Sequence, residues 1–217
     1  YVWGRGDVLR GLWNTLQLGI MAAVTAMGLF TLIAYVIIRS RSGAARLLDF
    51  VTWLPTLIPG VVLSLGLLQA FSGLPLMRFF YGTMASLVLA VLLGTVTVGV
   101  QFLKTSMRQL GRELEEAGWA SGGGRFYVVR RVVLPLIAPS IAVVGLETFA
   151  AANAAVGAVA LLGVGSLQPL SILQLNLLTS GQLEAASVVG FTIMTLTVVS
   201  AVLARWIGDK AGLEAKA

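Results

Sequence analysis

A polar segment at residues 104–135 stands between long apolar runs and reads KTSMRQLGRELEEAGWASGGGRFYVVRRVVLP. Within it, 111–121 has apolar residues at helical spacing and three early acidic residues, which suit the positive end of a helix dipole. Three glycines at 122–124 stop this helix, and a basic amphipathic stretch follows at 125–131. The segment predicts two short helices bent at glycine, which either fill a groove on a partner protein or lie among lipid headgroups.

Long runs without charged residues flank this segment and are typical of membrane-spanning helices. A bilayer core of about 30 Å needs roughly 20 apolar residues in helical form, and continuous runs favour helices over a β-barrel. We predict an all-α membrane protein with five spans, at about 13–38, 50–71, 83–103, 136–162 and 187–207. The polar stretch 163–182 suits an outer loop with a short helix around 172–178 better than a sixth span.

The composition excludes several classes of protein and site. Of the 217 residues, 58% are hydrophobic and 11% are charged, against about 25% charged in a soluble domain. The chain has no Cys and no His, which excludes disulfides, Cys/His metal sites and catalysis by either side chain. It also has no Gly-x-x-x-x-Gly-Lys-Ser/Thr phosphate loop. We expect no enzymatic activity, no metal site and no cofactor bound by this chain.

The basic residues are divided unevenly between the two predicted sides of the membrane. Twelve of the fifteen follow the first and third spans or lie in the C-terminal tail, whereas Arg5, Arg10 and Arg78 fall on the other side. Because basic residues are enriched in cytoplasmic loops, the N-terminus is predicted outside, and the C-terminus and residues 104–135 in the cytoplasm. We attribute the net charge of +6 to this topology and expect no nucleic-acid partner.

The polar segment resembles a loop in the integral membrane subunits of binding-protein-dependent ABC importers. That loop has the form Glu-Ala-Ala-x-x-x-Gly, nine residues, Ile-x-Leu-Pro. Here Glu116-Ala117-Gly118, three residues, Gly122, nine residues and Val132-Val133-Leu134-Pro135 stand at the same spacing. Two positions differ, since Gly118 replaces the second Ala and Val132 replaces Ile. Three successive glycines also replace the single glycine that is usual in the family.

This resemblance implies an all-α fold in the type I ABC importer permease core arrangement, whose bent loop docks into a cleft of an ATPase subunit. The coupling residues that the motif assigns are Glu116, Ala117, Gly118, Gly122, Leu134 and Pro135. By this reading, Glu116 pairs with a basic group of the ATPase, Ala117 and Gly118 allow close approach, and Gly122 permits the bend.

The resemblance also implies the partners. We expect a second permease core (a second copy or the other half of a fused chain), two ABC ATPase subunits that use the ATP, and an extracytoplasmic substrate-binding protein. The chain is then a multi-pass protein in the lipid bilayer of the bacterial inner membrane. The start at Tyr1 rather than Met, with the polar tail, would suit the second core of a fused chain.

Further segments are similar to one branch of these permeases, which imports ferric iron, thiamine, phosphonates or polyamines. They are Asn14-Thr15, the stretch 53–62 (WLPTLIPGVV) and the stretch 180–186 (SGQLEAA). The iron permeases often carry an Arg-Glu pair shortly before a glycine in the fourth span, where this chain has Ala154 and Ala155. The substrate is therefore expected within this group of solutes, without iron being singled out.

Four residues are candidates for the translocation path. Pro55 and Pro59 each remove a backbone donor and predict a kink, which either lines a path or is filled by neighbouring side chains. Glu147 is placed roughly 18 Å into the fourth span, near mid-bilayer, where it either lines a polar path or is a protonated carboxyl bonded to a neighbouring helix. Asn153 is a further candidate, about 120° around the helix from Glu147.

The alternative to an importer permease is a helical membrane protein of another class, such as a secondary transporter or an anchor, with a coincidental loop. Secondary transporters often carry inverted repeats and several intramembrane carboxylates. The sequence shows no convincing internal repeat and one deep carboxylate, Glu147. We therefore favour the importer permease.

Overall fold

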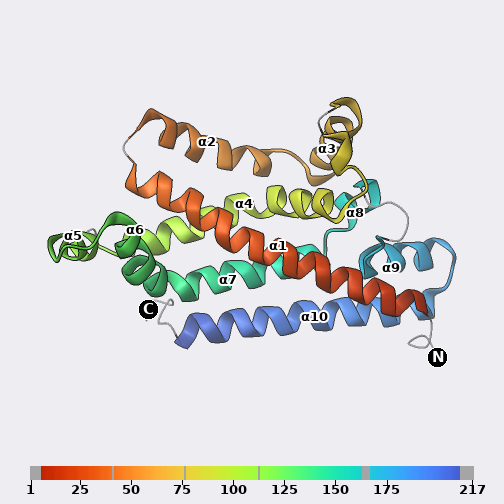
Figure 1. Cartoon of the computed structure of the whole chain (residues 1–217). Helices are drawn as coiled ribbons and strands as arrows, with labels where there is room; N and C mark the ends of the chain where they lie inside the picture. The colour runs from red at the N-terminus through yellow and green to blue at the C-terminus, as the bar shows by residue number, and fades with distance from the viewer. Residues whose placement is uncertain (1–5, 41, 76, 112, 163–166, 211–217) are drawn as a thin grey trace.

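Four long helices form the body of the molecule (Figure 1). The computed structural model describes residues 6–40, 42–75, 77–111, 113–162 and 167–210, and every regular element in these ranges is a helix. The long helices are α1 (Gly6–Arg39), α4 (Met84–Gln109), α7 (Leu134–Asn153) and α10 (Leu183–Lys210). Each is long and apolar enough to cross a membrane, and the span that includes α7 begins at Phe126. The all-α prediction is confirmed.

The core lies where α1 packs against α4 and α7. The buried face of α1 repeats every four residues along one side of the helix, at Leu18, Ala22, Ala26, Phe30 and Ala34. Glycines on the neighbouring helices leave room for the larger side chains of α1. A Cβ at Gly145 of α7 would lie 2.6 Å from the sulfur of Met27. Small residues at such contacts allow helices to pack closely in a membrane, and the glycines at these contacts have that role here.

The predicted span 50–71 is not a single straight helix. It is formed by α2 (Gly43–Leu57) and α3 (Gly60–Gly73), which meet at a bend of 110°. Ile58 is extended, with φ −103° and ψ 124°, because a residue that precedes proline is disfavoured in the helical region. Pro59 then precedes the first residue of α3 and has no N–H to continue α2. The 3₁₀ turn η2 (Arg78–Phe80) follows α3.

The predicted span 136–162 also divides in two. The helix α7 ends at Asn153, Ala154 leaves the helical region (φ −96°, ψ 1°), and α8 (Val156–Leu162) follows. Alanine is the best helix former, so local propensity does not account for a break at 154–155. The segment α8 packs against α3 and α4, and we attribute the break to this tertiary packing.

The short helix expected around 172–178 is present as α9 (Leu170–Thr179), which packs against α1, α8 and α10. Thr15 fixes its start, since the backbone N–H of Leu170 donates to Thr15 Oγ1 at 2.8 Å. The neighbouring Asn14 donates from Nδ2 to the carbonyl of Gln168 at 3.4 Å. The Asn-Thr pair therefore attaches α9 to the beginning of α1.

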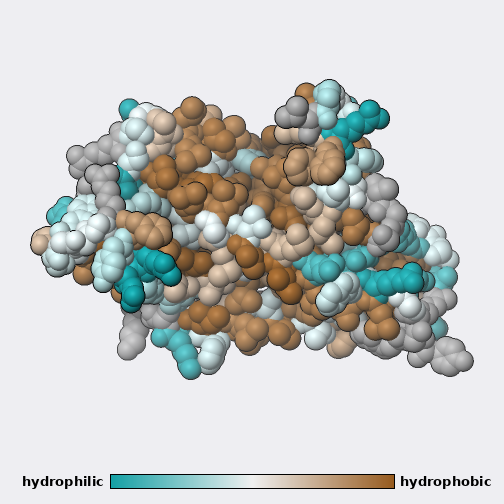
Figure 2. All heavy atoms as spheres, in the orientation of Figure 1, coloured by the Kyte–Doolittle hydropathy of each residue, from teal (hydrophilic) through white to brown (hydrophobic). Residues whose placement is uncertain are grey.

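The polar segment is shorter than the predicted loop 104–135. The helix α4 continues to Gln109, and after α5 (Glu113–Ala120) and α6 (Arg125–Val128) the π-helix η3 (Val129–Val133) leads directly into α7. These short helices, the last turn of α1 and the last turn of α10 lie at one end of the molecule, whereas α9 lies at the other (Figure 1). Figure 2 shows hydrophilic residues gathered around α5 and α6 and apolar residues over the middle. Which end faces the cytoplasm stays a prediction.

Candidate functional site

The helix α5 has two distinct faces. Its outward face carries Glu113, Glu116, Ala117 and Ala120, which are all exposed and follow the i, i+3, i+4, i+7 pattern of one helix surface. Glu115, by contrast, is buried at 2% exposure, and Gly118 lies three residues further along the same inner face. The motif residues Glu116 and Ala117 therefore lie on the surface that α5 presents outward from the molecule.

A glycine turn ends α5 in a Schellman arrangement. The N–H of Gly123 donates to the carbonyl of Gly118, and the N–H of Gly122 donates to that of Trp119, both at 3.0 Å. Gly122 has φ +88°, in the left-handed region that strongly favours glycine. The structure thus places Gly122 at the bend, as the motif implies.

Two of the other glycines are explained by contacts within the loop. A Cβ at Gly118 would lie 2.9 Å from Cγ2 of Val128, so this glycine lets α5 pack on α6. A Cβ at Gly123 would lie 2.8 Å from the carbonyl oxygen of Gly118. Gly124 has no neighbour within 4 Å of a Cβ, so packing does not require glycine there. The Cβ position of Gly118 thus points at Val128 of the same chain, and the role of Gly118 in approach of the ATPase stays a prediction.

An ion pair that sequence reasoning missed joins the inner face of α5 to the end of α1. Both Nε and Nη2 of Arg39 lie 2.6 Å from Oε1 of Glu115. The two residues are 76 positions apart, and the side chain of Glu115 is 3% exposed. Glu115 and Glu116 are adjacent acids on a short helix, so no local pattern in the sequence separates the buried one from the exposed one.

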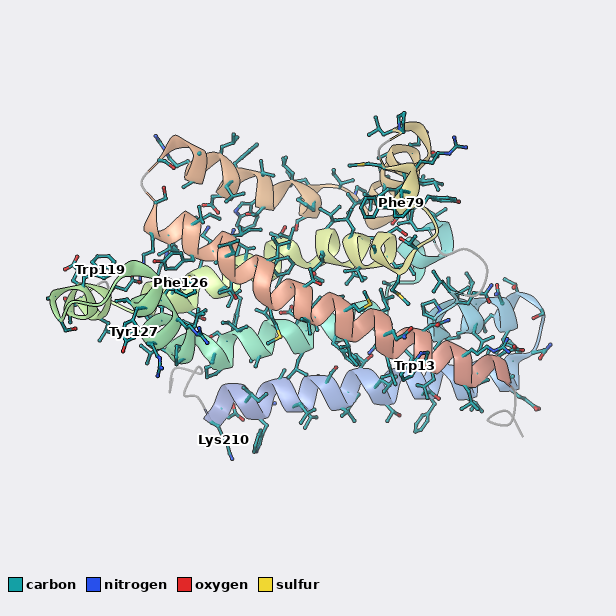
Figure 3. The ribbon with its side chains drawn as sticks, viewed as in Figure 1. Trp13, Phe79, Trp119, Phe126, Tyr127 and Lys210 are labelled. Atoms are coloured by element: carbon teal, nitrogen blue, oxygen red, sulfur yellow. The ribbon has the colours of Figure 1, made fainter. Side chains whose placement is uncertain are left out.

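The remaining motif residues lie where helix resumes toward α7. Val133 is buried, Leu134 is half-buried at the first position of α7, and Pro135 is exposed in its first turn. Beside them, the end of the molecule carries the exposed rings of Phe126 and Tyr127, at 78% and 59% exposure (Figure 3). The outward face of α5 thus carries acidic and small side chains, and α6 carries exposed aromatic ones.

A second missed ion pair fastens α2 to α4 near the same end. Lys104 Nζ donates to Asp49 Oδ1 and, at 2.9 Å, to Oε1 of Gln101, and Lys104 is 4% exposed. The sequence reading placed Lys104 at the start of the loop 104–135, and this loop boundary is wrong, because α4 continues past Lys104 to Gln109. Pairing with the carboxylate of Asp49 offsets the cost of burying Lys104 inside the helix bundle.

The four candidate path residues fall in different surroundings. Glu147 is exposed on α7, whereas Asn153 is 1% exposed at the end of that helix. Neither Oδ1 nor Nδ2 of Asn153 has a hydrogen-bond partner in the described part of the chain. Pro55 lies inside α2, and Pro59 stands at the bend between α2 and α3. None of the four is among the residues that line the groove between the broken spans, although Pro59 and Asn153 each adjoin one of those residues in the sequence.

What the structure does bring together is the pair of broken spans. A groove of about 390 Å³ lies between α3, α4 and the α7–α8 break. Small side chains line most of it, among them Gly60, Ser64, Gly94, Ala154 and Gly157. The run of small residues at 150–157 was a signal for this groove, although the sequence did not indicate which helix it meets.

Residues 31–212 match the family of binding-protein-dependent transport system inner membrane components. The chain belongs to this family. The resemblance inferred from the loop motif is thereby confirmed.

Two relatives of this inner membrane component show its place among permeases. It is 25% identical over 206 residues to the ferric transport system permease protein FbpB of Actinobacillus pleuropneumoniae, covering 92% of this chain and 29% of FbpB. It is also 25% identical over 193 residues to a probable sulfate transport system permease protein, cysT, of Helicosporidium sp. subsp. Simulium jonesii, covering 85% of this chain and 71% of cysT. The chain thus spans less than a third of the length of the ferric permease that it matches.

A solved structure shows that the inner membrane component has the fold of importer permeases. It superposes on a chain of a bacterial alginate ABC transporter in complex with an alginate pentasaccharide-bound periplasmic protein. The TM-score is 0.76 at 18% identity, over 96% of this chain and 79% of the other. The predicted permease fold is confirmed by this likeness.

Proposed function

We propose that this inner membrane component is the permease core of an ATP-driven importer and couples to a separate ATPase subunit through α5 and the glycine turn. The observation that carries the proposal is the outward face of α5, on which Glu116 and Ala117 of the family motif are exposed together. An exposed helix face at the end of the bundle is the surface that a partner's groove can take up. ATP is bound and hydrolysed by the partner, and this chain supplies the membrane path.

The path that we propose runs past the groove between the two broken spans. Freed backbone groups at a helix break in a membrane need polar partners or water, so breaks of this kind are expected beside a cavity. The breaks at Ile58–Pro59 and Ala154–Ala155 are close to one such groove, lined by α3, α4 and α8. Glu147 and Asn153 on α7 are the polar residues that we assign to the same route.

The assembly that we propose contains a second permease core, two ATPase subunits and an extracytoplasmic binding protein, in a bacterial inner membrane. The solved alginate transporter in complex with its periplasmic protein supports the binding-protein partner. The substrate is a small solute of the ferric iron, thiamine, phosphonate or polyamine group, and the ferric permease among the relatives supports iron as the first solute to test.

Uptake into proteoliposomes that contain the complete transporter tests this proposal. Glu116→Lys is expected to abolish ATP-dependent uptake while the protein stays in the membrane, because it reverses a charge on the outward face of α5. The matched control is Glu184→Lys, the same reversal on an exposed acid in the first turn of α10 at the opposite end of the molecule (Figure 1). Normal ATP-coupled uptake by Glu116→Lys would overturn the coupling role. Uptake that stops when the proton gradient is dissipated with ATP maintained would indicate a secondary transporter.

A further inference from the structure

We propose that Arg39 and Glu115 form a mechanical link that transmits movement of α5 to α1, so that α1 is driven directly by the coupling segment. This inference rests on the proposed function, because it assumes that a partner displaces α5. It assigns a positioning role to a pair of residues that the family motif does not contain. The motif assigns Glu116, whose side chain is on the outward face, whereas the link uses its buried neighbour.

The geometry of the pair is that of a strong, directional contact. Two nitrogens of one guanidinium approach the same carboxylate oxygen at 2.6 Å, and charge-assisted contacts of this length are among the strongest hydrogen bonds in proteins. The side chains are 16% and 3% exposed, so water does little to replace the contact once it is lost. Arg39 is also the last residue of α1, where a cation is favoured by the helix dipole.

The link adds a route that chain connectivity does not provide. Along the chain, α5 follows α4 and is joined through α6 and η3 to α7, and its packing is mainly against α6 and η3. Gly118 sits on Val128 in that packing, three residues from Glu115 on the same face of α5. The ion pair therefore attaches the inner face of α5 to a helix from the opposite end of the sequence.

The helix α1 is well placed to distribute a displacement. It packs closely along α4 and α7, with Phe30 seated over Gly99 and Met27 over Gly145. Tightly packed interfaces transmit small shifts because they do not deform continuously. A movement of α5 that reaches Arg39 is thus passed to both helices that flank α1.

The alternative is that the pair only holds the loop in place. The two roles differ in what they change. A purely structural pair alters the amount or stability of assembled transporter, whereas a transmitting pair alters the amount of substrate moved per ATP hydrolysed. The ratio of uptake to ATP hydrolysis, measured on assembled transporter, therefore separates them.

The experiment compares three variants of the complete transporter in proteoliposomes. They are Glu115→Gln, the double variant Arg39→Glu/Glu115→Arg, which swaps the two charges, and Lys104→Met. Lys104→Met is the matched control, since it breaks a buried ion pair near the same end that joins α2 to α4 and not to α5. We expect Glu115→Gln to bind the ATPase but to lower uptake per ATP about tenfold, within the usual range of coupling between sites. The swap should restore at least about half of the ratio, and Lys104→Met should leave it unchanged.

Several results would overturn the inference. The first is an unchanged ratio in Glu115→Gln, and the second is an equal loss in Lys104→Met. If Glu115→Gln does not assemble, Arg39→Lys, which keeps the charge but loses the Nε donor, takes its place, and failure of both to assemble would show a folding role alone. Loss of uptake in Glu116→Lys with normal coupling in Glu115→Gln would reject the link and keep the proposed function. Normal coupling in both variants would reject the proposed function as well.

Discussion

The aromatic ring of Phe30 on α1 occupies the space that a side chain at Gly99 of α4 would need. A Cβ at Gly99 would lie 2.5 Å from Cδ2 of the ring and 3.2 Å from Cγ1 of Val144 on α7. Phe30 is itself fully buried. The three central helices therefore meet at one glycine, and their spacing depends on the absence of a side chain there.

Gly99→Ala is expected to destabilise the helix bundle by about 1–3 kcal/mol, because overpacking a close-packed core forces side chains and backbone to shift. The measurement is the thermal unfolding of the detergent-solubilised protein. Gly94→Ala in the same helix is the control, since no atom lies within 4 Å of its Cβ position. Equal melting temperatures for the two variants would contradict the close contact.

Removing Asp49 should lower the stability of the protein more than removing Lys104, although both substitutions break the same ion pair. Asp49→Ala leaves the ammonium of Lys104 at 4% exposure with Gln101 as its remaining partner, and we expect a loss of about 2–3 kcal/mol. Lys104→Met leaves a carboxylate whose side chain is 33% exposed and can be hydrated, so the loss should be below about 1 kcal/mol. Thermal unfolding of the two variants checks this order. The reverse order would show that Asp49 loses more than Lys104 when its partner is removed.

Alanine should disturb the glycine turn at position 122 and leave it intact at position 124. Alanine at 122 must adopt φ near +88°, which costs about 1–2 kcal/mol for a residue with a Cβ. We expect Gly122→Ala to speed hydrogen exchange of the Gly123 amide, whose bond to the Gly118 carbonyl closes the turn. Gly124→Ala has free space around its Cβ and serves as the control. Similar exchange rates in both variants would contradict the Schellman geometry.

Asn153 should show opposed effects on stability and transport. Its amide is buried and lacks a partner in the described part of the chain, and an unsatisfied buried polar group costs about 1–3 kcal/mol. We expect Asn153→Leu to raise the melting temperature and to lower uptake, because a polar residue retained at this cost is needed for the path. Asn176→Leu, at an exposed position on α9, is the control for both measurements. A lower melting temperature for Asn153→Leu would refute the assignment.

The sequence by itself determined the helical membrane fold and the family. Long charge-free runs specify membrane helices because the bilayer thickness fixes their length, and this held for α1, α4 and α10. The bend at the glycines could also be predicted from the sequence, because a residue in the left-handed conformation, such as Gly122, is required locally to end α5. Proline before α3 indicated a kink, although its size of 110° was not encoded in the pattern.

The tertiary structure alone decided which charged residues are buried and paired. Adjacent residues on a helix point about 100° apart, so Glu115 faces Arg39 while Glu116 faces outward, and the direction depends on how α5 is seated. Asp49 and Lys104 likewise meet because α2 folds back along α4. Local periodicity carries no information on contacts across 55 or 76 residues, because these are set by which helix faces pack together.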